Sequence, residues 1–596
     1  MRLRDTIICL ICIILAAVLL ITAGMRLDFI NSQRKELKLI INEPLENAPP
    51  SLAFATVAMG AFRGLVVDML WIRAENLKEQ GQFFDAKQLA EWITTLQPRF
   101  AMVWEFQAWN MAYNISVAIP ATQPLERWRW VKNGYELLRD QGIPLNPKSI
   151  LLYRQLPLIF QHKIARVTDD AHEYYKLQLA SSMEPLLGPA DNEYFRAIAE
   201  APTEWKQITT DDNVVLLTKA LKSADRIFAD DNKFVNNYLA LRQNPHRFNP
   251  NAFEVINRFR GTDALKKLDI FAKSYYLRNT WKLDPVLMQQ LNQTYGPVNF
   301  DDPNEHFPLD WRHADSHAIY WAVKGLQTAG KEEFSIDETN TDRIVAHSLQ
   351  ALFRNGKIFT YDVPSQPPSD SSSLPSSDAV QSTIIRKEIF TRPDLRMLEP
   401  YNKAVLAVLE KYKDIPKKGT YESLKIGHRN MLENALTLFY DAGNVQQAQK
   451  IYKQLRQRYP KEEYKVPLIS FIRNSFREDI QRLGVNDAKE RIQMKLEEGY
   501  FRYAMHDDDE AFSREKVARE IYDLYQSMYS DHERIDLPEF KRLRFFALVS
   551  FINDRQYPFN LRQNLLGRIK LERPDLFEKL IKQAEERFRQ QGQTLK

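Results

Sequence analysis

The sequence predicts an almost entirely α-helical protein, built from paired helices that follow an N-terminal membrane helix. Glycine, which weakens helices, contributes only 19 of 596 residues, less than half its usual share of about 7%. Apolar residues recur at helical spacing along most of the chain, and short turns separate the segments into pairs. An uncharged apolar run near the N-terminus is long enough to cross a bilayer. These observations favour an α-solenoid or related helical array on an anchor.

The apolar run covers residues 6–23 and follows Arg2 and Arg4. At 1.5 Å per residue it can span a hydrocarbon core of about 30 Å, so residues 1–24 are predicted to be a signal anchor or transmembrane helix. A signal peptide cleaved after Gly24 is the alternative. Residues 25–50 would form a juxtamembrane linker. Both cysteines, Cys9 and Cys12, lie in the run, and the cysteine-free body suits an exported domain on the periplasmic side of a bacterial inner membrane.

A second apolar stretch, residues 52–72, contains Arg63 and Asp68 in its middle. Each charge would cost several kcal/mol at the centre of a bilayer, by order of magnitude. We therefore predict that this stretch forms a buried first helix pair of the body. A hairpin that rests on the membrane is the alternative.

The clearest helix pair lies at residues 432–460 (LENALTLFYDAGNVQQAQKIYKQLRQRYP). One face of the first helix carries Leu432, Ala435, Leu436 and Phe439, and the facing stripe of the second carries Val445, Ala448, Tyr452 and Leu455. Gly443 and Asn444 make the turn, and Pro460 ends the unit. Small residues would let the two helices approach, and the aromatic residues would fill the space beyond them. This segment resembles a tetratricopeptide repeat.

The same spacing recurs near the start of the body, over residues 70–98, and the 34-residue period places Trp104 and Ala108 in the next first helix. The resemblance, to uncharacterised bacterial membrane-anchored proteins of the tetratricopeptide repeat superfamily, implies protein binding in a groove lined by first helices. The candidate groove residues on those faces are Trp71, Glu75, Glu105 and Trp109. The Lys, Asn and Arg clamp that some members use to hold a partner's C-terminal carboxylate is absent from these positions.

A segment rich in serine and proline, residues 361–385, has almost nothing to bury and is predicted to be a disordered linker. It would divide one helical body at residues 51–360 from a second at residues 386–596. The alternative is a long loop within one continuous solenoid.

The composition argues against several other functions. The 82 basic and 77 acidic residues are interleaved, without the basic stripe that a nucleic-acid-binding protein of this size should show. No phosphate-binding, dinucleotide-binding or serine-hydrolase motif occurs, so no cofactor, catalytic residue or small-molecule substrate is predicted.

One segment does suggest an enzyme. His306, His313 and His317 lie among several aspartates, and His313 and His317 are one helical turn apart, which suits a metal. Ala314, however, occupies the place of the glutamate that activates water in the HExxH motif. We therefore favour a structural role, with Asp310 at a helix start, and predict no metal site. The leading prediction is a membrane-anchored scaffold for assembling an envelope complex. The alternatives are a metal-dependent enzyme and a polysaccharide groove lined by tryptophans.

Overall fold

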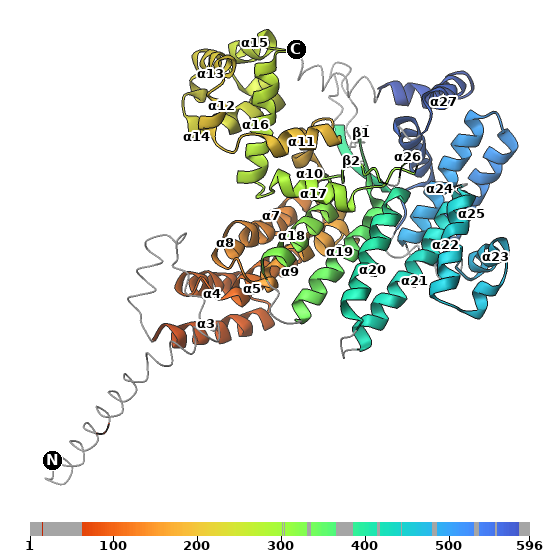
Figure 1. Cartoon of the computed structure of the whole chain (residues 1–596), viewed down its shortest axis with the longest axis horizontal. Coiled ribbons are helices and arrows are strands. Elements are labelled where there is room, and N and C mark those ends of the chain that lie inside the picture. Colours follow the sequence, from red (N-terminus) through yellow and green to blue (C-terminus); the bar gives the residue numbers. More distant parts are fainter. Residues whose placement is uncertain are drawn as a thin grey trace, which may run out of the picture. The chain divides into compact units, whose positions relative to one another are not determined.

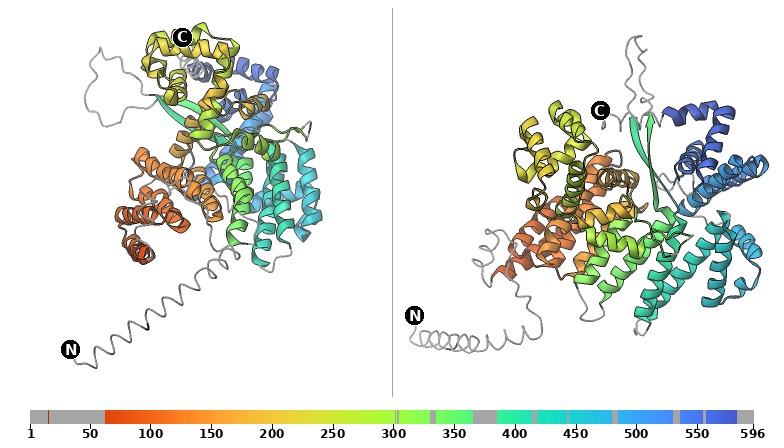
Figure 2. Two further views of the ribbon diagram at one scale, coloured as in Figure 1. Left: turned by 60° about the vertical axis from the view of Figure 1, so that its left-hand side comes forward. Right: turned by 45° about the horizontal axis from the view of Figure 1, so that its top comes forward.

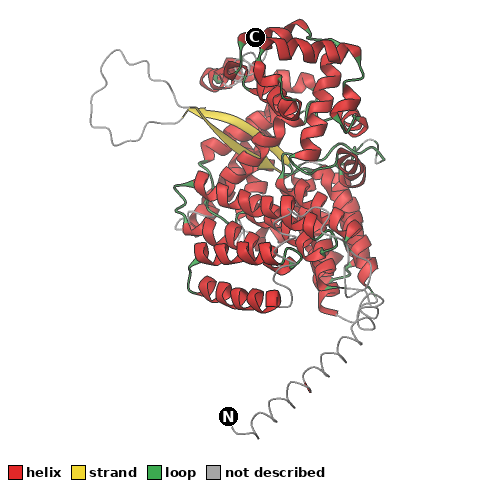
Figure 3. Ribbon diagram, turned by 90° about the vertical axis from the view of Figure 1, so that its left-hand side faces the viewer, coloured by secondary structure: helices red, strands yellow, loops and turns green. Residues whose placement is uncertain are grey.

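The structure, a computed structural model, describes residues 62–300, 302, 304–329, 335–364, 385–413, 418–442, 444–479, 485–529, 536–554 and 557–582, together with Leu15. Most of these residues are helical (Figures 1 and 3). The predicted anchor at residues 6–23 lies outside them apart from Leu15, and none of the helices they form is long and apolar enough to cross a bilayer. Asp68–Thr94 and Pro98–Lys596 form one compact unit, and Met1–Val67 with Thr95–Gln97 form another.

The first described helices are α3 (Phe62–Glu79), α4 (Phe83–Leu96) and α5 (Ala101–Trp109). Gly81, at a φ of +76°, makes the turn between α3 and α4, because a left-handed residue is easiest for glycine. Ala74, Ala86 and Ala90, which lie within the predicted repeat at residues 70–98, are all fully buried. The predicted stretch 52–72 is only partly described, and Met69 and Ile72 of its helical half are exposed, contrary to the expected burial.

The next three helices each contain a π-helical turn. In the first, α5 continues through the π-helical turn η1 (Asn110–Ile115) into α6 (Ser116–Ala118). In the second, α7 (Pro124–Leu137) continues through η2 (Leu138–Gly142) into α8 (Ile143–Leu145). In the third, α9 (Ile150–Leu158) ends in η3 (Ile159–Ala165). α10 (His172–Met183) follows and ends in the 3₁₀ turn η4 (Glu184–Leu186). At the junction of α9 and η3, Pro157 lies inside the helix, where its missing N–H favours a wider turn.

Residues 191–295 form shorter helices that are capped mostly by acidic side chains. They are α11 (Asn192–Glu200), α12 (Trp205–Ile208), α13 (Asp212–Ala224), α14 (Asp231–Gln243), α15 (Pro250–Arg258), α16 (Asp263–Asn279) and α17 (Pro285–Tyr295). The 3₁₀ turns η5 (Arg226–Phe228) and η6 (Pro245–Arg247) connect some of them. Asp211, Asp230 and Asp284 each accept a backbone hydrogen bond at a helix N-cap, which fixes where those helices begin.

The central helices α18 (Ala314–Thr328) and α19 (Ile336–Asn355) pack against each other and against α9. After the 3₁₀ turn η7 (Leu395–Met397), the chain forms α20 (Leu398–Tyr412), α21 (Lys418–Asp441), α22 (Val445–Arg458), η8 (Glu462–Lys465) and α23 (Leu468–Asp479). The predicted pair at residues 432–460 is confirmed as α21 and α22. All its predicted stripe residues except Val445, which is exposed, are buried.

The last described helices are α24 (Val485–Ala504), α25 (Asp508–Tyr529), α26 (Phe540–Asn553) and α27 (Phe559–Glu572). α24 packs on α25, α26 and α27. Its buried residues contribute to two small hydrophobic clusters in addition to the main core. Of these three helices, α25 forms the most extensive contact with α24.

The sequence did not predict the two-stranded antiparallel sheet formed by β1 (Lys357–Pro364) and β2 (Ile385–Arg392). Lys357 pairs with Arg392 at one end and Pro364 with Ile385 at the other, so the strands take both ends of the predicted linker 361–385. Figure 2 shows this hairpin among helices from both sides of the segment. One hydrophobic core extends from Trp104 to Met494. The helices before and after the segment therefore share that core.

Candidate functional site

Two of the four predicted groove residues, Trp71 and Glu75, lie on α3. The Trp71 ring lies between α3 and the start of α5, with its centroid 5.8 Å from that of Phe100 and 5.1 Å from that of Phe106. Glu75 accepts a 2.8 Å hydrogen bond from Lys78, one turn later on the same helix. Trp71 therefore packs helices together, and Glu75 is held in a local ion pair.

The other two predicted residues lie on α5. Glu105 accepts from Arg154 of α9 at 2.9 Å, and Arg154 Nε lies 3.3 Å from Asp337 of α19. Desolvation by burial raises the pKa of Glu105, against the opposing charge of Arg154. Trp109 stacks on Tyr113 at 4.0 Å and keeps 39% of its surface exposed. Of the four residues, Trp109 offers the most accessible apolar surface.

Exposed large apolar side chains gather on these N-terminal helices. The N-terminal apolar surface consists of Met69 and Ile72 on α3, Phe84 and Trp92 on α4, and Met102 and Trp109 on α5, with exposures between 39% and 72%. Between residues 119 and 300 the same class is represented only by Leu125, Leu216, Ile227, Val286 and Phe300. Met69 and Ile72 lie one turn apart, so they share a face of α3. Exposed apolar side chains mark an interaction site where they adjoin one another in a patch, whereas single ones are ordinary surface.

The three histidines of the alternative metal site have structural partners. His317 is fully buried, donates from Nε2 to the Trp311 carbonyl at 2.9 Å, and stacks on Phe160 at 5.1 Å. His313 is the N-cap of α18, with Nδ1 accepting from the Asp315 N–H, and His306 Nδ1 donates to the Gly296 carbonyl. Desolvation lowers the pKa of both His313 and His317 to about 4. Among the residues described here, no three His, Cys, Asp or Glu side chains are grouped to hold a metal.

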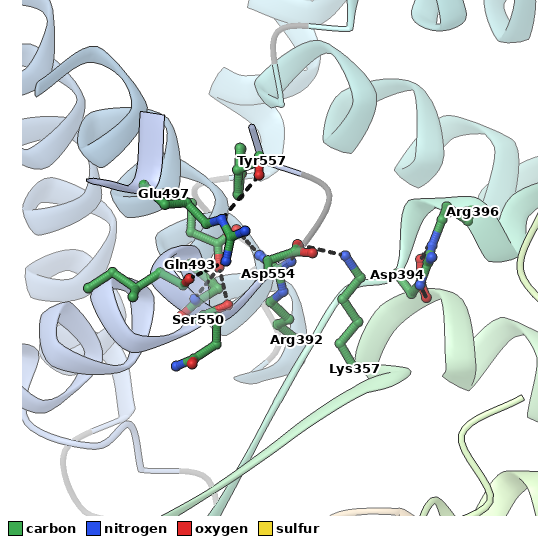
Figure 4. Close-up of polar contacts among 12 residues, drawn as sticks. Lys357, Arg392, Asp394, Arg396, Gln493, Glu497, Ser550, Asp554 and Tyr557 are labelled. Atoms are coloured by element: carbon green, nitrogen blue, oxygen red, sulfur yellow. Dashed lines mark hydrogen bonds and ion pairs between the residues drawn. The ribbon is translucent and has the colours of Figure 1, made fainter. Parts of the chain in front are cut away.

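A buried network of charged residues connects the base of the β-hairpin to the C-terminal helices (Figure 4). Arg392 of β2 donates to Glu497 of α24 and to Asp554, which follows α26. The Lys357 Nζ donates to Asp554 at 2.9 Å. Gln493 and Ser550 donate to the Oε1 of Glu497 at 2.7 and 2.9 Å. Desolvation and the charge of Arg392 lower the pKa of Lys357 to about 8.

Lys357 and Asp554 also line a polar cavity of about 420 Å³. Two turns of the same kind, Asp-x-Arg, border it: Asp310 with Arg312, and Asp394 with Arg396. In each turn the arginine backbone N–H and guanidinium both donate to the aspartate two residues earlier, with guanidinium distances of 2.7 to 2.9 Å. Each aspartate thus neutralises the arginine of its own turn at the border of this cavity. The repeated DWR and DLR tripeptides are its sequence signal.

The N-terminal apolar surface is thus the candidate site for a partner, and the buried network and the histidines stabilise the fold that carries it. In comparisons with known proteins, the chain matches no protein-family model, and no curated protein is significantly similar to it.

Proposed function

We propose that this chain is a membrane-anchored scaffold of the tetratricopeptide type, which binds a protein partner through its N-terminal apolar surface during assembly of an envelope complex. The observation that carries the proposal is the exposure of six large apolar side chains on three successive helices. Burying them against a partner would contribute about 25 cal/mol for each Å² removed from water. Met, Trp and Phe are also residue types enriched at the centres of protein interfaces.

The helix pairs support the repeat assignment. In α21 and α22, Ala435 and Ala448 are fully buried, and Phe439 and Tyr452 pack beside them. The pair α3 and α4 repeats this use of alanines with Ala74, Ala86 and Ala90. This is the arrangement that the tetratricopeptide pattern predicts for each unit.

The anchor is supported by the sequence alone, through the uncharged run at residues 6–23. α3 begins at Phe62, so the exposed helices follow the anchor closely along the chain.

Site-specific photocrosslinking in cells tests the proposal on the full chain. A photoreactive phenylalanine analogue would replace Met102 or Trp109, and a matched control would replace Ile227, which is 47% exposed on the distant turn η5. We expect positions 102 and 109 to form adducts with the same protein, identified by mass spectrometry, and position 227 to form none. Adducts with lipid alone would reassign the surface to the membrane, and equal adducts at all three positions would refute a specific interface.

A further inference from the structure

Helix α22 (Figure 1) carries charge of only one sign. Its sequence, VQQAQKIYKQLRQR, contains four basic residues, five glutamines and no acidic residue. The basic residues are Lys450, Lys453, Arg456 and Arg458, and all four are exposed. On most surface helices the signs alternate, because opposite charges three or four residues apart stabilise the helix. The residues of α22 itself therefore do not offset its positive charge.

Three of these cations lie on one face of the helix. Lys450, Lys453 and Arg456 are spaced by three residues, so their side chains follow one another along α22. Arg458 follows in the last turn and completes the set, which we call the basic face. The opposite side of the helix packs into the core through Ala448, Ile451, Tyr452 and Leu455. Burial of that side fixes the basic face toward solvent.

Neighbouring elements do not neutralise the basic face. In the part of the chain that the structure describes, none of its four cations forms an ion pair, and Arg456 lies over the Tyr452 ring at 5.9 Å. The elements that pack against α22 are α21 and η8. Four of their acids lie 2.5 to 3.7 Å from other cations, in the pairs Glu422–Lys425, Glu433–Arg429, Glu462–Lys465 and Glu463–Lys461. The positive potential of the basic face is therefore available to a partner.

The other exposed side chains of α22 indicate the class of that partner. Surfaces that lie on a bilayer combine basic residues with large apolar ones. Among the residues of α22, which the structure describes in full, Val445 is the one exposed large apolar residue. Proteins that bind single-stranded nucleic acid stack aromatic rings on the bases, whereas the one aromatic residue of α22, Tyr452, is buried. The exposed glutamines Gln446, Gln449 and Gln457 suit a peptide instead, because their amides donate and accept hydrogen bonds without adding charge.

We propose that the basic face binds an acidic segment of another protein. Lys450 and Arg458 are eight residues apart, which is about 12 Å along a helix. An extended chain rises about 3.3 Å per residue, so about four residues rich in Asp and Glu would cover the face. The two arginines would hold carboxylates in a bidentate manner, and the two lysines would add charge. The basic face shares no residue with the N-terminal apolar surface, so this contact is independent of the one proposed there.

Fluorescence anisotropy at low ionic strength, with the full chain in nanodiscs of phosphatidylcholine, tests this proposal. The labelled probes are octaglutamate, octaglutamine and an oligonucleotide of eight thymidylates. We expect octaglutamate to bind at least tenfold more tightly than octaglutamine, and at least as tightly as the oligonucleotide. Tighter binding of the oligonucleotide, or displacement of octaglutamate by vesicles of phosphatidylglycerol, would overturn the proposal in favour of nucleic acid or lipid.

Charge reversal tests whether the binding takes place on α22. Lys453→Glu combined with Arg456→Glu should weaken octaglutamate binding at least tenfold, and the corresponding pair of glutamine substitutions should weaken it by less. The matched control is Lys219→Glu combined with Lys266→Glu, which makes the same change in net charge at exposed positions of α13 and α16 and should retain the affinity. All these positions are exposed, so each variant should keep the melting temperature of the original protein. Equal affinities of the two charge-reversed variants would show a response to net charge alone and contradict the assignment to the basic face.

Discussion

The guanidinium of Arg392 lies between the carboxylates of Glu497 and Asp554 and donates hydrogen bonds to both. Arg392 and Glu497 are only 4% and 2% exposed, so the pair is desolvated. Strand β2 is thereby fixed to α24 and to the end of α26, which are more than a hundred residues away in the sequence. Figure 4 shows the guanidinium in contact with both carboxylates.

Arg392→Met should lower the free energy of unfolding by about 3–5 kcal/mol, because removing one partner leaves buried carboxylates without compensation. Lys387→Met is the control, since Lys387 lies exposed on the same strand, and it should change stability by about 0.5 kcal/mol or less. Urea unfolding followed by circular dichroism measures both. Equal midpoints for the two variants would mean that the network does not hold the hairpin.

Asp315→Asn should stabilise the protein increasingly as pH rises from about 4 to about 7. The folded state raises the pKa of Asp315 from 3.8 to about 7, so it keeps a proton that the unfolded state releases. The original protein therefore loses stability over this window, whereas asparagine does not titrate. At about 1.4 kcal/mol per pKa unit, the difference at pH 8 is at most about 4 kcal/mol.

Urea midpoints at pH 5 and pH 8 measure this effect. The buried histidines titrate in both proteins, so their contribution cancels in the difference. Asp523→Asn, at an exposed position of α25, is the control and should show no pH-dependent gain. A gain for Asp315→Asn that is the same at both pH values would show that the carboxyl group is ionised in the folded state.

His317→Ala should lower the free energy of unfolding by about 2–4 kcal/mol, because it empties a buried ring site against Phe160 and removes the hydrogen bond to Trp311. The exposed His246→Ala should have little effect. Metal analysis of both purified variants by mass spectrometry complements the urea titration. A stoichiometric metal that is lost only with His317 would instead support the metal-dependent enzyme.

Helical periodicity was sufficient to locate most of the fold. The stripe of Leu432, Ala435 and Phe439 faces Ala448 because a helical repeat of 3.6 residues is a local property, readable within one segment. The β-hairpin was missed because its pairing is not local. Lys357 meets Arg392 across a segment whose composition predicts disorder, and neither strand alternates clearly between polar and apolar residues.

The sites were harder to predict for a related reason. The charge of Glu497 suggests a solvated helix face, yet its partners come from β2 and α26, which the sequence does not place nearby. The repeat pattern pointed to α3 and α5, but it selected Trp71, which packs against Phe106, over Met69, which is exposed. Asp310 was expected at a helix start, and it does shape the turn before α18, although His313 is the N-cap. The type of a residue does not by itself determine whether a neighbouring helix will bury the helix face on which that residue lies.

The same substitution at two helical glycines should have opposite effects on stability. A Cβ atom at Gly325 of α18 would lie 2.3 Å from the Cβ of Tyr153 on α9, whereas one at Gly427 of α21 would meet nothing within 4 Å. Alanine favours a helix over glycine by about 1 kcal/mol, so Gly427→Ala should stabilise the protein by about 0.5–1 kcal/mol. Gly325→Ala should destabilise it by about 1–3 kcal/mol, because overpacking must push α18 away from α9. Urea titration measures both effects. Stabilisation by both substitutions would contradict the close approach of α18 to α9 at Gly325, and with it the packing of the N-terminal helices against the rest of the core.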